Sequence, residues 1–302
     1  MNIYRHIADK ATLEREYSPS SCVGDLAPIL DQYASRSAAA RASCPDFRTL
    51  QYGPSPAESL DYFPAPSART GQRATPVMVY IHGGYWQELS KNEHSFPASD
   101  FARHDVGYLA VNYGLAPEAT IDGMVDRCRR AMAWIAREAS ALGIDPAGIH
   151  LSGCSAGGHL TAMTMFAPWA RYGLATSPVR SVTLLSGVFD LRPLPLTYVN
   201  DAVGMSAEDA LRNSPLLLVD AVDGDLPPAL IAYGENETGE FKRQSREFAE
   251  GIERRGGQAR VHEIADRNHF DLVFDLANEE TDFGALVWRH IGDPAHTQVT
   301  PR

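Results

Sequence analysis

The chain has 302 residues and carries 27 Lys and Arg against 38 Asp and Glu, a formal net charge of −11. Hydrophobic residues make up 44% and charged residues 22%, which is typical of a folded globular protein. The acidic balance, without a local run of Lys or Arg, excludes nucleic acid and anionic lipid as expected partners.

The N-terminal region is predicted to form a helix followed by two strands. A helical pattern over 26–42 precedes strand-like segments at 47–52 and 59–63, which we expect to form an antiparallel edge of the main sheet. The next loop, 64–76, is rich in Pro, Ser and Arg, but too few residues precede it to build a separate domain. One domain is therefore expected across the chain, with 1–45 as a helical covering segment and 46–295 as the core.

From residue 75 onward, short apolar segments alternate with helical patterns. The predicted strands are 77–81, 107–111, 148–152, 179–186, 228–233 and 259–264, and the predicted helices are 96–103, 121–142, 156–166, 240–255 and one around 285–288. The stretch 192–225, rich in Pro and Asp, is predicted to be irregular. This alternation predicts an α/β fold, with a mostly parallel central sheet and helices on both of its faces.

The cysteines and the N-terminal residues indicate in which cellular compartment the protein is expected. Four cysteines occur without a paired spacing, so reduced thiols are expected. The N-terminus lacks the apolar segment of a secretory signal, and no run of about 18 apolar residues is present to span a bilayer. We therefore expect a soluble, cytoplasmic protein without a membrane partner.

The strongest chemical signal is the pattern G-x-S-x-G. Residues 153–157 read Gly-Cys-Ser-Ala-Gly, directly after a predicted strand and at the start of a predicted helix. In that context the glycines permit a sharp turn that presents the Ser155 hydroxyl as a nucleophile. A tight strand–helix turn with an inert, buried serine is the ordinary alternative. A phosphate-binding turn is excluded, because neither G-x-G-x-x-G nor G-x-x-x-x-G-K-[ST] is present.

A second glycine-rich turn follows the strand at 77–81. Residues 82–86 read His-Gly-Gly-Tyr-Trp, and a turn of this kind can direct backbone N–H groups at the oxyanion of an acyl-transfer intermediate. We predict Gly84 and Tyr85 as donors together with Ala156, with Gly83 required for the turn. His82 is predicted to brace this loop. Packing in the core or in a pocket wall is the ordinary alternative for Tyr85 and its neighbour Trp86.

A serine nucleophile needs a base, and the base needs a carboxylate to orient it. After a strand–turn–helix of this type, the acid and then the base follow late in the chain. His269 lies in a loop just past the strand at 259–264, whereas His262 lies within that strand and His290 within the last helix. His269 is therefore the predicted base.

The acid is expected just after the strand at 228–233. Glu235 and Glu237 both lie there, and proximity alone permits either. Glu237 is preferred, because a loop needs a few residues to turn away from the strand end. Cys154 is a rival nucleophile. No H-E-x-x-H motif or clustered His and Asp spacing is present, so neither a metal nor another cofactor is expected.

Several segments carry a family resemblance. They are His-Gly-Gly-Tyr-Trp-Gln at 82–87, Asn-Tyr-Gly-Leu-Ala-Pro-Glu at 112–118, the Ser155 turn, Ser-Gly-Val-Phe-Asp-Leu at 186–191, Arg-Asn-Ser-Pro at 212–215, Glu-Phe with Arg-Gln-Ser within 240–245, and His-Phe at 269–270. With these segments in order over about 75–275, the chain resembles the hormone-sensitive-lipase-like α/β-hydrolases. More narrowly, it resembles the serine-dependent kynurenine formamidases, or arylformamidases.

The resemblance implies a nucleophile at Ser155, an acid at Glu237, a base at His269 and an oxyanion loop at 82–86. It implies a small aromatic amide as substrate, an N-formyl arylamine such as N-formylkynurenine, cleaved to formate and the free amine. A broad small-acyl carboxylesterase and a non-catalytic ligand-binding protein of the same fold are the alternatives, and a homodimer is left open. Two positions depart from the group: Glu237 stands where Asp is usual, and Cys154 where His is common and is not expected to face the substrate oxygen.

Overall fold

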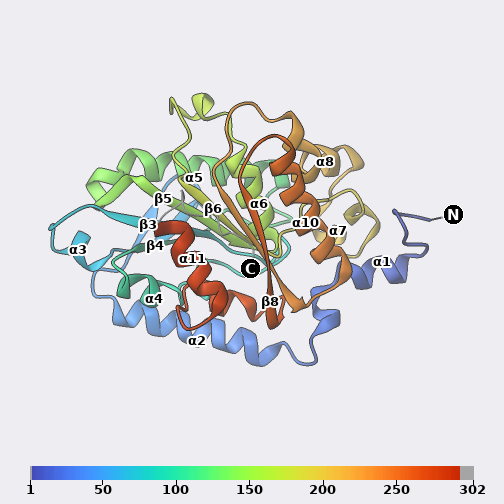
Figure 1. Cartoon of the computed structure of the whole chain (residues 1–302), viewed down its shortest axis with the longest axis horizontal. Helices are drawn as coiled ribbons and strands as arrows, with labels where there is room; N and C mark the ends of the chain where they lie inside the picture. The colour runs from blue at the N-terminus through green and yellow to red at the C-terminus, as the bar shows by residue number, and fades with distance from the viewer. Residues whose placement is uncertain (1, 293–302) are drawn as a thin grey trace.

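An eight-stranded sheet runs through the computed structural model, which describes residues 2–292 (Figure 1). Its strands are β1 (Arg48–Gln51), β2 (Ser59–Phe63), β3 (Thr75–Ile81), β4 (Gly107–Val111), β5 (Ile144–Cys154), β6 (Ser181–Leu185), β7 (Ala229–Asn236) and β8 (Ala259–Asn268). They lie in the order β1-β2-β4-β3-β5-β6-β7-β8. β1 and β2 are antiparallel and pair through β2 with β4, whereas β4 to β8 are parallel. The predicted antiparallel edge and parallel sheet are both confirmed.

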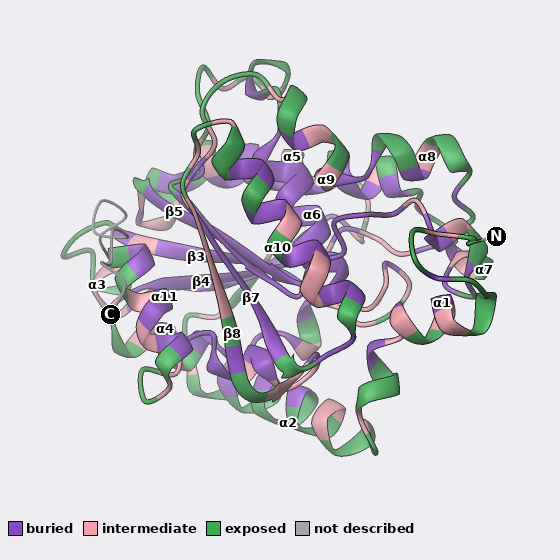
Figure 2. Ribbon diagram, turned by 45° about the vertical axis from the view of Figure 1, so that its right-hand side comes forward, coloured by how far each residue is buried: buried purple, intermediate pink, exposed green. Residues whose placement is uncertain are grey.

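Helices cover the two faces of this sheet because its strands are apolar on both sides. Val77, Val79 and Ile81 pack in one core cluster with α5 (Ile121–Leu142), α6 (Ala156–Met165) and α10 (Gly239–Arg254). Met78 and Tyr80 point to the other cluster, under α2 (Ala27–Ser43), α4 (Ala98–Arg103) and α11 (Asp282–Gly292). Figure 2 shows the central strands buried along their length and the edge strand β8 largely half-buried. No helix within residues 2–292 has the length and apolar character of a membrane span.

The long helix α5 illustrates how local sequence sets an element. Thr120 caps its N-terminus by accepting a hydrogen bond from the Gly123 N–H, and Gly143 ends it at φ 71°. A residue with a β-carbon is disfavoured at that left-handed position, so glycine is the usual helix terminator there. Both ends therefore follow from residues visible in the sequence, and the predicted span 121–142 is confirmed.

The short helices were not predicted. They are α1 (Lys10–Glu16), α3 (Pro66–Arg69), α7 (Asn200–Val203), α8 (Ala207–Arg212), α9 (Pro215–Leu218), and the 3-10 turns Pro19–Cys22, Lys91–Glu93, Trp169–Tyr172, Leu194–Leu196, Val219–Ala221 and Leu272–Asp275. Segments of three to seven residues are too short to display a helical period. The stretch 192–225 is thus a series of short turns and helices. The last three residues of the predicted core, 293–295, lie outside the described residues.

The N-terminal segment is attached by buried polar contacts. The Tyr17 hydroxyl donates to Glu240 at 3.0 Å and accepts from the Gln244 amide at 3.1 Å, both on α10. Glu240 also pairs with Arg243 at 2.6 Å. From α2, the Tyr33 hydroxyl donates to the Phe270 carbonyl. Because buried polar groups must find partners, these contacts fix the segment against the core.

A buried ion pair holds the loop that follows β3. Lys91 Nζ lies 2.7 Å from Asp61 Oδ1 on β2, with side-chain exposures of 11% and 1%. We expect Asp61→Asn to leave the lysine charge buried without a counter-ion and to cost about 3 kcal/mol of unfolding free energy. Urea denaturation measures this loss. Asp100→Asn is the control, because the exposed Asp100–Arg103 pair should contribute less than about 1 kcal/mol. Equal losses in both variants would contradict the prediction.

Candidate active site

The predicted site residues come together because each follows a strand of the same parallel sheet. Gly83 and Gly84 follow β3, Ser155 follows β5, Glu237 follows β7 and His269 follows β8. β3, β5, β6, β7 and β8 are successive neighbours in the sheet. The carboxyl ends of parallel strands meet at one edge, where ligands bind in open α/β sheets. Residues separated by up to 186 positions in the chain therefore share one edge of the sheet.

Ser155 occupies a strained turn between β5 and α6. Its φ of 58° and ψ of −121° are rare for a residue with a side chain. A β-carbon at Gly153 would collide with the Gly157 carbonyl, and one at Gly157 would collide with the Ile81 carbonyl. Both glycines of the G-x-S-x-G pattern are therefore required by close approach of the backbone. The Ser155 N–H is held by the Leu185 carbonyl at 2.9 Å, which anchors the turn.

His269 is paired with Glu237. Its Nδ1 lies 2.7 Å from Glu237 Oε2, and both side chains are buried. A carboxylate only accepts, so Nδ1 carries the proton, and in the neutral imidazole Nε2 has a free lone pair. The ring is further positioned by an edge contact with Phe241, 4.6 Å between centroids. The exposed Glu235 instead accepts from the Asp266 N–H, so the carboxylate beside His269 belongs to Glu237.

Sequence reasoning missed the support behind Glu237. Its Oε1 accepts from the Ser186 hydroxyl at 2.5 Å and from the Gly234 N–H at 2.6 Å. Ser186 follows β6 and has a φ of 44°, so it has the same strand-end position as the other site residues. That position, visible once the strand at 179–186 is predicted, was the available signal. With three donors around it, the carboxylate is fixed in orientation.

Backbone N–H groups without protein acceptors surround Ser155. Within residues 2–292, the N–H groups of Gly83, Gly84, Tyr85 and Ala156 donate to no acceptor in the protein. Gly83 and Ala156 are buried, and Ala156 is the first residue of α6. Buried N–H groups are nearly always paired, and helix N-termini favour anions. These N–H groups can therefore donate hydrogen bonds to a negatively charged oxygen beside Ser155.

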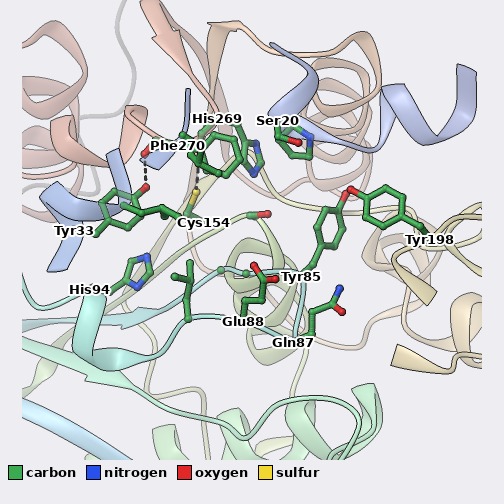
Figure 3. Close-up of a pocket in the computed structure, with 17 residues that line it drawn as sticks. Ser20, Tyr33, Tyr85, Gln87, Glu88, His94, Cys154, Tyr198, His269 and Phe270 are labelled. Atoms are coloured by element: carbon green, nitrogen blue, oxygen red, sulfur yellow. Dashed lines mark hydrogen bonds between the residues drawn. The ribbon is translucent and has the colours of Figure 1, made fainter. Parts of the chain in front are cut away.

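The cavity over Ser155 has a volume of about 220 Å³ (Figure 3). Ser155, His269, Gly83, Gly84 and Tyr85 line it. The N-terminal segment and distant loops complete its wall with Pro19, Ser20, Leu26, Leu30, Tyr33, Gln87, Glu88, Leu89, His94, Cys154, Tyr198 and Phe270. The N-terminal covering segment therefore forms part of the cavity wall.

His82 and its aromatic neighbours support the glycine-rich turn. His82 Nδ1 donates to the Gly83 carbonyl at 2.8 Å, and its ring stacks on Tyr113 with centroids 4.4 Å apart. Burial, together with His94, lowers the pKa of His82 to about 3, so the ring is neutral. Trp86 is fully buried and donates to His159, while Tyr85 lies in the cavity wall and donates to the Tyr17 carbonyl. Both aromatic side chains are packed against neighbours, and bracing of the turn by His82 stays a prediction.

Cys154 also lines the cavity, with its thiol 3.9 Å from the His269 carbonyl. Burial and the nearby Glu237 raise the pKa of this thiol well above its ordinary value. Because the thiolate is the reactive form, Cys154 is a poor nucleophile in this position. Within the described residues, no three His, Cys, Asp or Glu side chains form a group that could hold a metal ion.

The buried histidines predict that the protein loses stability in mild acid. Burial lowers the pKa of five of them to about 3 or 4: His82, His94, His150, His159 and His290. Unfolded histidine binds its proton near pH 6.5, so below that pH the unfolded chain takes up protons that the folded chain refuses. We expect each of these five histidines to lower the free energy of unfolding by about 2 kcal/mol as the pH falls from about 7 to 5. Urea denaturation at the two pH values measures this loss.

A matched pair of variants checks this acid effect. In His290→Gln the amide can still donate to the Val182 carbonyl, as His290 Nε2 does at 3.0 Å. Between about pH 7 and pH 5, the free energy of unfolding of this variant should fall by less than that of the native protein. The difference should equal the contribution of one buried histidine, about 2 kcal/mol. The part-exposed His104, which pairs with Glu279, provides the control as His104→Gln. Unfolding free energy that stays constant down to pH 5 would contradict the prediction.

Comparisons with known proteins agree with this fold. A family model described as the alpha/beta hydrolase fold matches residues 78–272. Kynurenine formamidase of Danio rerio is 32% identical over 295 residues, 94% of this chain and 97% of its own length. Esterase LipQ of Mycobacterium tuberculosis is 28% identical over 271 residues, 80% of this chain and 63% of its own. A solved esterase of Pyrobaculum calidifontis shares the fold, with a TM-score of 0.68 at 20% identity over 94% of this chain and 97% of its own. The chain therefore belongs to the α/β-hydrolase family, among the relatives of the kynurenine formamidases.

Proposed function

We propose that this protein is a serine hydrolase that cleaves an N-formyl arylamine to formate and the free aromatic amine. The observation that carries the hydrolase assignment is the strained Ser155 turn, which shares one cavity with His269, the partner of Glu237. The formamide is supported by the similarity to the Danio rerio kynurenine formamidase over nearly the whole length of both chains.

The first half of the reaction forms an acyl-enzyme. Ser155 Oγ attacks the formyl carbon while His269 Nε2 takes the hydroxyl proton. Glu237, held by Ser186 and Gly234, keeps the imidazole in the required tautomer and stabilises the imidazolium. The C–N bond then breaks, the amine leaves with the proton from Nε2, and the formyl group remains as an ester on Ser155.

The second half releases formate. Water gives a proton to His269 and attacks the formyl ester, and the Ser155 oxygen leaves and regains its proton. In both halves the carbonyl oxygen becomes negatively charged, and the unpaired N–H groups of Gly83, Gly84, Tyr85 and Ala156 are the donors for it. Such donors act strongly because they are already in place before the charge develops.

Gly83→Ala tests the oxyanion turn. A β-carbon at Gly83 would lie 2.9 Å from the Cys154 carbonyl and 3.2 Å from Ser155 Cβ, so the turn must move away from the nucleophile. We expect kcat to fall on the order of 10²-fold, as for the loss of one oxyanion donor. Gly24→Ala is the control, since a β-carbon there meets nothing within 4 Å. Equal kcat values for the two variants, each folded by circular dichroism, would remove the turn from catalysis.

A broad small-acyl carboxylesterase is the second candidate, favoured by the similarity to the esterase LipQ. The two are separated by comparing kcat/KM for N-formyl-L-kynurenine and p-nitrophenyl acetate. A strong preference for the formamide supports the arylformamidase. Turnover of p-nitrophenyl acetate alone would overturn the arylformamidase proposal and favour an esterase. Turnover of neither substrate would favour a ligand-binding protein without chemistry.

A further inference from the structure

The cavity wall has an unequal distribution of charge. Among its seventeen lining residues, all within the described part of the chain, there is one carboxylate, Glu88, and no Lys or Arg. Burial lowers the pKa of His94 to about 4, so this histidine is uncharged at neutral pH. Burial raises the pKa values of Tyr33, Tyr85 and Cys154, which keeps them neutral as well. Glu88 is therefore the one carboxylate among these lining residues.

The turn from Gly84 to Glu88 fixes where this carboxylate lies. The Gly84 carbonyl accepts from the N–H groups of both Gln87 and Glu88, at 3.0 and 2.9 Å. Gly84 has a φ of 98°, and a β-carbon on it would collide with the Glu88 backbone, so the turn depends on glycine. The turn follows the predicted oxyanion donors directly. The turn therefore fixes the position of the Glu88 backbone relative to Gly84.

The Glu88 side chain is unpaired in the part of the chain that the structure describes. It is exposed, and within residues 2–292 no hydrogen bond or ion pair engages its carboxylate, whereas Glu58, Glu237, Glu240 and Glu247 are all paired. Figure 3 shows its side chain extending into the cavity beside Tyr85. The phenol rings of Tyr85 and Tyr198 form the adjacent wall. A carboxylate in a wall that holds no Lys or Arg attracts a cation.

We propose that Glu88 makes this enzyme select substrates whose leaving group carries a cationic substituent, such as an ammonium, over neutral and anionic ones. The inference rests on the proposed hydrolase function and extends it to the class of leaving group. For a zwitterionic amino acid substrate, the ammonium meets Glu88, whereas the carboxylate finds no lysine or arginine in the wall. Aryl formamides with a carboxylate as their sole charge are disfavoured.

An isosteric substrate series isolates this charge. Formanilides with a meta-trimethylammonio, meta-tert-butyl or meta-carboxylate group present a cation, a neutral group of the same shape and an anion. The readout is the ratio of kcat/KM between the cationic and the neutral substrate within each enzyme variant. Effects of the substituent on the intrinsic reactivity of the amide cancel when these ratios are compared between variants.

We expect Glu88→Gln to lower the cationic-to-neutral ratio by about two- to fivefold, the range for an exposed ion pair. Glu88→Lys should reverse the preference and favour the carboxylate substrate over the cationic one. Raising salt from about 0.02 to 0.5 M should reduce the native ratio toward that of Glu88→Gln. Glu250→Gln is the matched control, because it removes an exposed carboxylate of α10 that does not line the cavity.

The outcomes separate this inference from the proposed function. The same series is run as phenyl acetates. Hydrolysis of the acetates without the formanilides would overturn the formamidase proposal while still reporting the charge preference. Equal ratios in native protein, Glu88→Gln and Glu250→Gln would overturn the role of Glu88 and leave the hydrolase intact. Failure of both series would overturn both proposals.

Discussion

Ser155→Ala is expected to lower kcat/KM by about 10⁴- to 10⁶-fold, the range for loss of a serine nucleophile. The hydroxyl is the atom that would form the acyl-enzyme, and no neighbouring group has the position and pKa to replace it. The thiol of Cys154 is adjacent, but burial raises its pKa and keeps it protonated. Turnover of N-formyl-L-kynurenine and p-nitrophenyl acetate measures the loss.

Two controls make the Ser155→Ala result specific. Ser152→Ala removes a buried hydroxyl of β5 that has no hydrogen-bond partner, so it should fold and retain turnover. Cys154→Ala should also retain turnover if Ser155 is the nucleophile. Circular dichroism and thermal unfolding show whether each variant folds. Three results together would identify Cys154 as the nucleophile instead: Ser155→Ala stays active, Cys154→Ala is inactive, and a thiol alkylator blocks the native protein.

Glu237→Gln is expected to lower kcat on the order of 10⁴-fold, as when the acid of a Ser-His-Asp triad is changed to an amide. The orientation of the new amide is forced, because the Gly234 N–H and the Ser186 hydroxyl both donate to Oε1. Its NH₂ group must then face His269 Nδ1 and donate to it. The imidazole proton moves to Nε2, and the ring can no longer accept the proton of Ser155.

Glu235→Gln is the matched control for Glu237→Gln. Glu235 lies two residues away on the same strand end, is exposed, and accepts from the Asp266 N–H. The same chemical change there should alter kcat less than about twofold, since exposed carboxylates contribute little. A large loss in Glu235→Gln with a small loss in Glu237→Gln would exchange the roles of the two carboxylates. Pre-steady-state kinetics with p-nitrophenyl acetate would show which half-reaction is slowed.

The main elements of the core were predictable because their signals are local. Strand β4 has the predicted bounds, 107–111, and helix α5 the predicted bounds, 121–142. Apolar periodicity and capping residues within each segment specify these elements. The parallel order of strands then placed Ser155, Glu237 and His269 at one edge, because each follows its strand directly. Their catalytic roles remain predictions for the variants above.

The choice between Glu235 and Glu237 as the partner of His269 needed the tertiary structure. Glu235 lies at the end of β7 and Glu237 directly after it, so nearness to the strand end permits either. The difference is that Ser186 from β6 and His269 from β8 approach Glu237, whereas Asp266 approaches Glu235. Those contacts depend on how three strand ends lie relative to one another, and no local pattern encodes that arrangement.

By itself, the sequence determined the α/β fold, the glycine-rich turns and the strand-end residues, because each depends on neighbours a few positions away. Only the tertiary structure decided the partner of His269, the cavity and its charge. Tyr33 and Pro19 reach the cavity from the N-terminal segment, Tyr198 reaches it from a run of short helices, and Glu88 reaches it from the turn after β3. These are packing contacts between segments far apart in the chain, formed when the folded core buries apolar surface and pairs its polar groups.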